Sequence, residues 1–388
     1  MYSMTNTDTN QQHHSLTDTT LDPRVFAREI GLELRPSVTE SDQTGEISHT
    51  AFDILRSSGM TAALVPREFG GGGATHAEMG TILRELGRHD PATAVTLSMH
   101  SHVLAAQVWR HNHGMNAEGA FRKVVDDHAI FVNSGASDWV GSTGEARAVD
   151  GGFRVSARKS PISGCEVGTI LATSVRWESA PDGPSVIHCT IPCGAEGVRI
   201  DRTWDTMGLR ATGSHTVVLD DVFVPDAAVS LVRPADVWHP IWNTVLGAAL
   251  PLIMSAYVGI ADEAIDIARA TVDGRTDPHV LQLVGEMMNA HTTAAGVIAA
   301  MFMDADNLNF DNTDRFASRA LSRKTIVCQN VIETVRLAIE VTGGLGYTRS
   351  SDLERLYRDV HGCLFHPLPR AKQLRFTARV ELGLDPVS

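Results

Sequence analysis

The sequence has a shortage of basic residues and few cysteines, and both limit what the protein can do. Its 33 Lys and Arg stand against 46 Asp and Glu, which gives a formal net charge of −13. Nucleic acids and anionic membranes are bound by clustered cations, so neither is expected as a main partner. The five cysteines are odd in number, and only Cys189 and Cys193 lie close together. Neither a zinc site nor a disulfide framework is therefore indicated, and reduced thiols in the cytoplasm are expected.

The chain also lacks the motifs of several other classes of site. The glycines at 70–73 are not followed by Gly-Lys-Ser/Thr, so this stretch is not a Walker loop. A Gly-x-Ser-x-Gly elbow is absent, which argues against an esterase-like hydrolase. The pairs His13–His14 and His111–His113 have no carboxylate or cysteine at ligand spacing. No metal site is predicted from them.

Two stretches bear on location. Residues 1–20 are polar and have no apolar core of a secretory signal, so we expect a disordered tail. The most apolar stretch, Val245 to Ala261, contains Pro251 and runs directly into Asp262. It falls short of a confident membrane span, and a buried helix of a bundle is favoured.

The periodicity of apolar residues divides the 388 residues into three parts. From 21 to 128 they recur at spacings of three and four, which predicts a helical domain. From 129 to 234 they alternate, as in Gly152 to Ala157, and turns such as Asp150-Gly151 separate the runs, which predicts a small β-domain. From 235 to 388 four long helices are predicted, with the last one beginning near Pro369. Their short connections are typical of an antiparallel bundle.

Four motifs occur in a fixed order along the chain: Pro66–Gly71, Trp204–Ser214 followed by Val218–Pro225, Gly343–Tyr347, and Leu356–His361. Together they resemble the acyl-CoA dehydrogenase superfamily over nearly the whole chain from about Asp22 onward. The resemblance implies an N-terminal helical domain, a middle β-domain and a C-terminal four-helix bundle. It also implies a flavin where the three meet, and a homotetramer or a homodimer.

The resemblance assigns cofactor contacts to particular residues. Ser163 matches a Thr or Ser that lies beside the flavin N5 in relatives, although it could be an ordinary hydroxyl at the end of a strand. A loop that covers the flavin in relatives corresponds here to Asn133, Ser134 and Ser142. The glycines Gly343, Gly344 and Gly346 match a turn that touches the cofactor of a neighbouring subunit. They also suit a helix C-cap, and both readings can hold.

The carboxylate of conventional family members is missing. A Glu that abstracts the α-proton of a thioester commonly stands nine residues after the Arg of the Arg358-Asp359 pair, and Pro367 occupies that place. A second place for the base, on the first bundle helix, corresponds to Ala249 or Leu250. None of these side chains accepts a proton, so ordinary acyl-CoA dehydrogenation lacks its base.

The grip on the cofactor also departs from the family pattern. Many dehydrogenases have an Arg-x-x-Phe-Gly segment between the first two bundle helices, where this chain has only the short connection Asp273 to Pro278. A weaker hold on the adenine half of FAD follows. The cofactor is expected to be FMN or FAD. The weaker hold suggests FMN, or a flavin that comes and goes.

His366 stands immediately before Pro367. It matches a His near the flavin C4a in the flavin monooxygenase branch, of the dibenzothiophene monooxygenase and p-hydroxyphenylacetate hydroxylase type. That branch takes reduced flavin from a separate reductase, forms a C4a-hydroperoxide with O2, and transfers one oxygen to a small molecule. His366 would donate a hydrogen bond or act as acid-base group, and Ser163 would protect the hydroperoxide. Alternatively, His366 belongs to a simple turn, and His361 takes the catalytic part.

The remaining assignments concern the substrate and two rival functions. The predicted apolar lining of the substrate site consists of Trp204, Leu97, Met99 and Tyr257. Trp204 is also expected beside the flavin, and core packing is the alternative for it. One rival is a dehydrogenase whose base is Asp352 or Glu354 in the loop after Tyr347. The other is a non-catalytic scaffold subunit. Arg210 either binds an anion or ties the β-domain to Asp205.

Overall fold

The computed structural model describes residues 22–387, and the predicted tail at 1–20 lies outside them. The N-terminal domain is helical and is built from six α-helices, α1 (Pro23–Leu34), α2 (Val38–Thr44), α3 (His49–Ser57), α4 (His76–His89), α5 (Pro91–Asn112) and α6 (Glu118–Asp126). Polar side chains begin the longer ones. Thr75 and Glu78 form a capping box at the start of α4, and Asp90 accepts from the Thr93 N–H at the start of α5.

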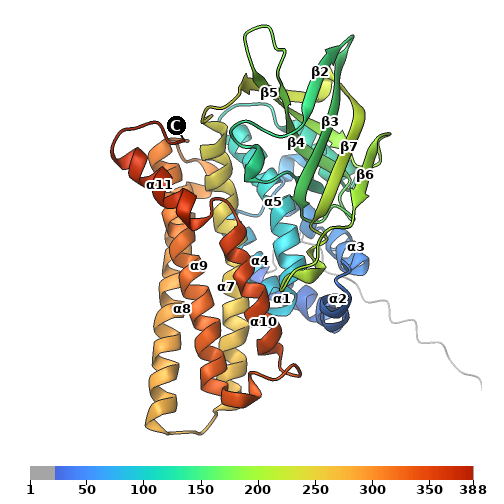
Figure 1. Cartoon of the computed structure of the whole chain (residues 1–388). Coiled ribbons are helices and arrows are strands. Elements are labelled where there is room, and N and C mark those ends of the chain that lie inside the picture. The colour runs from blue at the N-terminus through green and yellow to red at the C-terminus, as the bar shows by residue number, and fades with distance from the viewer. Residues whose placement is uncertain (1–21, 388) are drawn as a thin grey trace, which may run out of the picture.

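The middle domain consists of two four-stranded sheets packed on a common core (Figure 1). One sheet has the order β1-β4-β5-β8 and the other β2-β3-β7-β6. The strands are β1 (Phe131–Asn133), β2 (Glu145–Val149), β3 (Gly152–Ile162), β4 (Ile170–Trp177), β5 (Ser185–Pro192), β6 (Val198–Asp201), β7 (His215–Pro225) and β8 (Val229–Pro234). Alternation along β3 buries every second side chain, as the sequence predicts.

The C-terminal part is a helical bundle of α7 (Ile241–Thr271), α8 (Pro278–Ala305), α9 (Asp314–Thr342), α10 (Asp352–Val360) and α11 (Arg370–Glu381). Figure 1 shows α7, α8, α9 and α10 running side by side, with α11 lying at one end of them. The helix beginning near Pro369 is therefore present, but α10 takes the fourth place in the bundle. A loop was expected at α10, because Asp352 and Glu354 follow a run of turn residues; Ser351 caps the helix there instead.

Helix α7 carries the apolar stretch that raises the membrane question. It is the one helix of the described residues that is long and apolar enough to span a membrane, yet 94% of its most apolar window is buried inside the protein. Helix α7 packs closely on α4, because Gly87 and Gly259 lack side chains and let the two backbones come into contact. A Cβ at Gly259 would lie 2.0 Å from the Arg84 carbonyl oxygen. The prediction of a buried bundle helix is confirmed.

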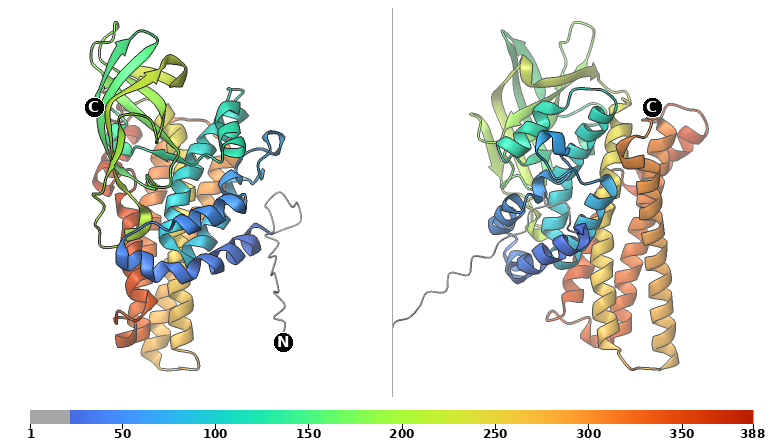
Figure 2. Two further views of the ribbon diagram at one scale, coloured as in Figure 1. Left: turned by 90° about the vertical axis from the view of Figure 1, so that its right-hand side faces the viewer. Right: turned by 180° about the vertical axis from the view of Figure 1, so that it is seen from behind.

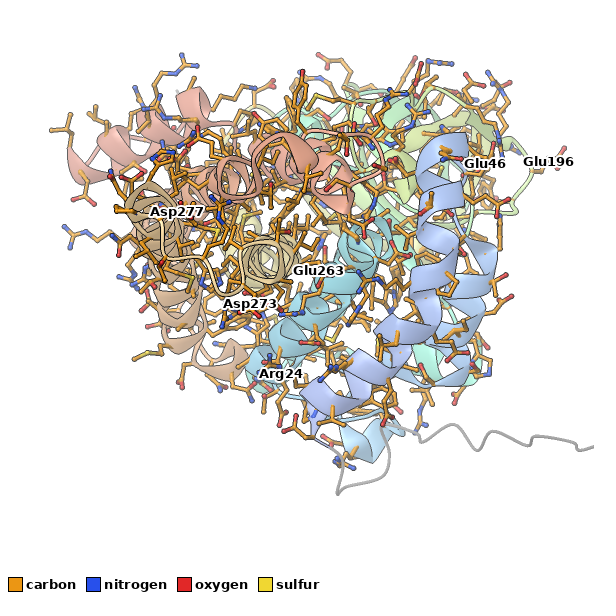
Figure 3. The ribbon with its side chains drawn as sticks, turned by 90° about the horizontal axis from the view of Figure 1, so that it is seen from below. Arg24, Glu46, Glu196, Glu263, Asp273 and Asp277 are labelled. Atoms are coloured by element: carbon orange, nitrogen blue, oxygen red, sulfur yellow. The ribbon has the colours of Figure 1, made fainter. Side chains whose placement is uncertain are left out.

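The N-terminal helices occupy the angle between the β-domain and the bundle (Figures 1 and 2). Ion pairs fasten this interface at its lower end. Arg84 binds Asp262 of α7 through two hydrogen bonds of 2.6 and 2.8 Å, and Arg35 donates to Glu263 at 2.8 Å. Figure 3 shows Glu263 between α7 and the helices of the N-terminal domain. Contacts of α5 with α7 and β1, and of α10 with α7, bring the three domains together.

Candidate active site

The middle-domain signature meets the bundle at a tight backbone junction. Leu209 has a left-handed φ of 51°, and its N–H donates to the Asp359 carboxylate at 2.6 Å. Gly208 lies so close to α10 that a Cβ there would be 2.3 Å from the Arg358 carbonyl. Burial raises the pKa of Asp359 to about 6, against the pull of Arg355 and the Leu209 N–H. This carboxylate therefore holds the signature loop and is not free to act as a base.

The arginine of the Arg358-Asp359 pair is also structural. Its guanidinium makes hydrogen bonds of 3.0 and 2.7 Å to Asp42 of α2 and further ones to Glu354 and the Met207 carbonyl. Arg210 donates to the Asp42 carbonyl at 2.8 Å and to Asp205 at 3.2 Å. Of the two roles open for Arg210, the tie to Asp205 is the one observed.

Ser163 lies at the end of a short chain of hydroxyl groups. Ser214 donates to the Ser163 hydroxyl at 2.8 Å, and the Ser214 oxygen lies 2.7 Å from that of Thr212. Thr212 lies 3.0 Å from the Leu209 carbonyl at the junction. When Ser163 accepts from Ser214, its own hydrogen is left for a partner outside the chain of hydroxyls. That is a suitable donor for a flavin edge.

The other predicted cofactor contacts lie in the adjoining loop. Asn133 donates to the Met99 carbonyl at 3.1 Å, and Ser134 accepts from Thr173 at 3.1 Å. Among residues 22–387 the amide oxygen of Asn133 and the hydrogen of Ser134 have no further partner, so both are unused. Ser142 lies elsewhere in the loop and donates to the Ser174 carbonyl at 2.8 Å. Together with Ser163, the unused groups of Asn133 and Ser134 fit the hydrogen-bonding needs of a flavin.

A buried ion pair fixes this loop to the β-domain. The Lys159 ammonium lies 2.8 Å from the Asp138 carboxylate, and both side chains are almost fully buried. Lys159 also donates to the carbonyl oxygen and to the hydroxyl oxygen of Thr143. Burial lowers the pKa of Lys159, while Asp138 opposes that shift. Because an unpaired buried charge is costly, the pair holds the loop between residues 138 and 143 in one place.

Trp204 is held by its backbone and by its ring nitrogen. The N–H groups of Thr203 and Trp204 both donate to Nδ1 of His215, at 3.1 and 3.0 Å, and the indole N–H donates to the Leu209 carbonyl at 3.0 Å. The indole is partly exposed. Trp204 is thus fixed over the Gly208–Leu209 junction with one side open, so its role as a wall of the flavin pocket stays a prediction.

His366 and Tyr257 form a hydrogen-bonded pair inside the bundle. The Tyr257 hydroxyl lies 2.7 Å from Nε2 of His366, and the two rings meet edge to face with centroids 5.4 Å apart. Burial lowers the pKa of His366 to about 3, with smaller contributions from Lys324 and His102. The imidazole is therefore neutral at ordinary pH.

The segment around His366 is anchored by a buried lysine. Lys324 of α9 donates to the His366 carbonyl at 2.9 Å and approaches that of Leu368 at 3.5 Å. His361, the other candidate, uses its Nδ1 against the Tyr357 carbonyl at 2.6 Å and packs on the Tyr357 ring. Lys324 thereby positions His366, while His361 is committed to its own helix.

The predicted places for a base hold no carboxylate. Ala249 and Leu250 are buried in α7, and Pro367 follows His366. Asp352 and Glu354 do not lie in a loop, because they form the first turn of α10, where Asp352 lies 3.5 Å from Arg355 and Glu354 binds Arg358 at 2.8 Å. Their charges suit a helix N-terminus, which is a structural role.

The predicted lining residues differ in access. Leu97 and Tyr257 are sealed, at 1% and 0% exposure, whereas Met99 is partly exposed. The turn with Gly343, Gly344 and Gly346 ends α9 as a C-cap, with Gly343 at a φ of 63°. Its neighbours Leu345 and Tyr347 are strongly exposed, as is Phe365 beside His366. Contact with a neighbouring subunit stays a prediction.

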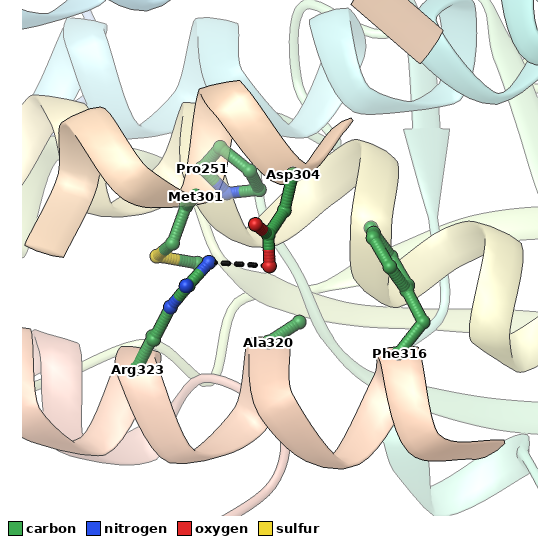
Figure 4. Close-up of a pocket in the computed structure, with 7 residues that line it drawn as sticks. Pro251, Met301, Asp304, Phe316, Ala320 and Arg323 are labelled. Atoms are coloured by element: carbon green, nitrogen blue, oxygen red, sulfur yellow. Dashed lines mark hydrogen bonds and ion pairs between the residues drawn. The ribbon is translucent and has the colours of Figure 1, made fainter. Parts of the chain in front are cut away.

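Two hollows elsewhere are not this site. A cavity of about 10 Å³ lies between α7, α8 and α9, beside the Asp304–Arg323 ion pair (Figure 4), and is no larger than one water. A second hollow of about 370 Å³ lies among α1, α2 and α3, away from Ser163 and His366. Among residues 22–387, no group of three His, Cys, Asp or Glu side chains could hold a metal.

Comparison with known proteins identifies the family. Residues 23–114 match the model of the acyl-CoA dehydrogenase N-terminal domain, and residues 246–363 match that of the C-terminal domain. The chain belongs to the acyl-CoA dehydrogenase family. The amino sugar nitrososynthase DnmZ of Streptomyces peucetius is 27% identical over 89% of each chain. The dibenzothiophene monooxygenase of Mycolicibacterium goodii is 24% identical over 89% of this chain and 90% of its own.

A solved structure agrees with this placement. The X-ray structure of KijD3 in complex with FMN and dTDP-3-amino-2,3,6-trideoxy-4-keto-3-methyl-D-glucose superposes with a TM-score of 0.83 at 25% identity, covering 96% of this chain and 97% of KijD3. The predicted acyl-CoA dehydrogenase-like fold is confirmed, and so is a flavin-dependent oxidoreductase.

Three features of the site were missed from the sequence: His102, Lys324 and the Asp138–Lys159 pair. Lys324 gave a signal, since it falls on the apolar face of α9 with Leu321, Val327 and Val331. A lysine on such a face requires buried acceptors. His102 and Asp138 gave no such signal, because the periodicity of apolar residues does not distinguish their positions from surface positions.

Proposed function

We propose that this chain is the oxygenase component of a two-component flavin monooxygenase. Reduced flavin, when bound, supplies the activation of O2. The residues of the chain bind and orient: Ser163 donates toward the flavin edge, Trp204 excludes water, and His366 directs a neutral N–H at the site of oxygen transfer. The substrate is a small molecule.

The observation that carries this proposal is the hydrogen-bonded pair of buried Tyr257 and half-buried His366, beside which no carboxylate of residues 22–387 makes a contact. Nε2 of His366 lies 2.7 Å from the Tyr257 hydroxyl, and burial holds the pKa of the imidazole at about 3. Such a group stays neutral and donates a hydrogen bond, but it is a poor base for the α-proton of a thioester. The monooxygenase and nitrososynthase names among the relatives favour the same reaction class.

FMN is proposed as the flavin, delivered in reduced form by a separate reductase. The connection between α7 and α8, residues 272–277, lacks the arginine segment that grips FAD in many dehydrogenases. The complex of KijD3 with FMN supports this choice. A homo-oligomer, tetrameric or dimeric, is also proposed, because Leu345, Tyr347 and Phe365 expose between 70% and 82% of their surface.

Isotope incorporation tests the reaction. Protein, FMN and a flavin reductase with NADH are incubated under ¹⁸O₂ with a panel of aromatic, sulfur and amine compounds, and products are read by mass spectrometry. We expect one ¹⁸O atom in a product, loss of that product with His366→Ala, and its retention with His361→Ala. Oxidation of acyl-CoA with a dye acceptor, without ¹⁸O in any product, would overturn the proposal.

A dehydrogenase is the second candidate, and the family membership is what favours it. It requires a base, and the two nearest candidates in the sequence, Asp352 and Glu354, are bound to arginines of α10. Unchanged dye reduction in Asp352→Asn and Glu354→Gln variants would remove these residues from the reaction. A scaffold without flavin is excluded if the purified protein binds FMN.

A further inference from the structure

His215 of β7 accepts two main-chain N–H groups at one ring nitrogen. The N–H groups of Thr203 and Trp204 lie 3.1 and 3.0 Å from its Nδ1. A main-chain N–H group can only donate, so Nδ1 acts as the acceptor and carries no hydrogen. The imidazole of His215 is therefore in its neutral form, with its hydrogen on Nε2.

The carboxylate of Glu166 lies at the other ring nitrogen. Its Oε2 is 3.4 Å from Nε2 of His215, and the two side chains are 8% and 7% exposed. This is a long contact, but Oε2 has no hydrogen-bond partner among residues 22–387. Its Oε1 accepts from Arg202 at 2.5 Å, and Gly213 leaves room for the carboxylate, since a Cβ there would lie 3.0 Å from Oε2. A carboxylate only accepts, which agrees with the hydrogen on Nε2.

The backbone of His215 is tied to the strand that leads to Ser163. In the sheet His215 pairs with Ile162, the last residue of β3, and Ser163 follows directly. Ser214, the residue before His215, donates to the Ser163 hydroxyl at 2.8 Å. The backbone of His215 is therefore fixed beside Ser163, while its ring holds the main chain of Trp204.

Trp204 is consequently held at two points. Nδ1 of His215 binds its main-chain N–H, and the Leu209 carbonyl accepts from its indole N–H at 3.0 Å. The neighbouring Thr203 is bonded to Thr216, because its hydroxyl oxygen accepts from the Thr216 N–H at 3.1 Å. Loss of the acceptor on His215 should therefore tilt the segment at Trp204 without detaching it from β7.

We propose that His215, with Glu166 at its second nitrogen, is a positioning residue that sets Trp204 relative to Ser163 at the bound flavin. This inference rests on the proposed function, in which Trp204 and Ser163 both contact the cofactor. His215 acts through the main chain of Trp204 and not on the reacting atoms. The role requires an acceptor bonded to Cγ. An asparagine offers its amide oxygen there, whereas a leucine offers no acceptor.

The visible absorption and circular dichroism of bound oxidised FMN test this role without oxygen or a reductase. Trp204→Phe defines the spectrum of a flavin with an altered wall. His215→Leu should shift the spectrum in the same direction and weaken FMN binding about tenfold, since two N–H groups lose their acceptor. His215→Asn should keep the wild-type spectrum and affinity. The proposal is overturned if folded His215→Leu behaves like the wild type, if His215→Asn behaves like His215→Leu, or if Trp204→Phe leaves the spectrum unchanged.

A control variant and a neutron map complete the test. His76→Leu is the matched control, because this histidine is also buried but its ring binds the Ala248 carbonyl, so the FMN spectrum should stay that of the wild type. Neutron diffraction from crystals of the deuterated full chain at neutral pH should show deuterium on Nε2 of His215 and none on its Nδ1 or on Glu166. Deuterium on Nδ1 would overturn the proposal, and this map decides if His215→Leu fails to fold.

Failure of this inference is distinguishable from failure of the proposed function. A wild-type FMN spectrum in His215→Leu, together with ¹⁸O in a product, would reject the positioning role and keep the monooxygenase. The expected spectra without ¹⁸O in any product would keep the positioning role and reject oxygen transfer.

Discussion

Ser163 illustrates how one hydroxyl is prepared by its neighbours. Its oxygen accepts from Ser214, whose oxygen is 2.7 Å from Thr212, and the chain ends at the Leu209 carbonyl. The Leu209 carbonyl only accepts, so Thr212 donates to it, and the single hydrogen of Ser214 goes either to Ser163 or to Thr212. Ser163 can therefore donate to a bare nitrogen or accept from an N–H group, whichever the flavin presents.

Replacing Ser163 by Ala should reduce the yield of oxygenated product per reduced flavin about tenfold, because one hydrogen bond worth about 1–1.5 kcal/mol is lost. Product and hydrogen peroxide are measured together in the reductase-coupled assay. Ser163→Thr keeps the hydroxyl and should retain most of the yield. Ser160→Ala, at an exposed position of β3 three residues before Ser163, is the control. An unchanged yield in Ser163→Ala would show that this hydroxyl only ends a strand.

Elements meet at the site through close backbone contacts, and one of them is at Gly208. A Cβ there would lie 2.3 Å from the carbonyl carbon and oxygen of Arg358, atoms that belong to a helix and cannot swing away. The loop that carries Leu209 and Trp204 would have to move off α10. The Leu209 hydrogen bond to the buried Asp359 would then break.

Gly208→Ala should therefore lower the free energy of unfolding by about 2–4 kcal/mol, through overpacking and a lost hydrogen bond to a buried carboxylate. FMN binding should weaken with it. Thermal unfolding and a fluorescence titration with FMN measure the two effects. Gly119→Ala is the control, because a Cβ on this α6 glycine meets nothing within 4 Å. It should stabilise α6 slightly. Equal midpoints for the two variants would contradict the role given to Gly208.

Periodicity predicted most of these elements but not their meeting points. The long helices α7, α8 and α9 and the alternation along β3 follow from local patterns. Helix α10 was missed because it spans only nine residues after a turn-rich run. The bond between Tyr257 and His366 joins residues 109 positions apart. Such contacts depend on how helices pack, and nothing in either local sequence encodes the partner.

At the scale of the whole molecule, buried neutral histidines make stability depend on pH. Burial lowers the pKa of His76, His100 and His102 to about 4, and that of His188 and His366 to about 3. His100, for example, accepts from the Phe131 N–H at Nδ1, and a proton there would break that bond. Unfolding releases these rings to their ordinary pKa of about 6.5.

The sign follows from which state binds more protons. Between pH 6.5 and about 4 the unfolded chain takes up protons on these five rings that the folded chain refuses, so acidification favours unfolding. Two buried carboxyls act in the opposite direction: burial raises the pKa of Asp359 to about 6, and it raises that of Asp90 as well. The five rings outnumber these two carboxyls, so the unfolded state binds more protons and stability falls as the pH is lowered.

The midpoint of thermal unfolding should thus stay nearly constant from pH 8.5 to 7 and fall by at least about 5 °C from pH 6.5 to 5. Scanning calorimetry at constant ionic strength measures it. In His100→Gln the decline should be shallower, because one of the rings no longer takes up a proton on unfolding. A midpoint that is flat down to pH 5 would mean that these rings are charged in the folded protein. The neutral His366 on which the oxygen-transfer reaction depends would then lose its physical basis, since desolvation is the leading cause of the lowered pKa in all five.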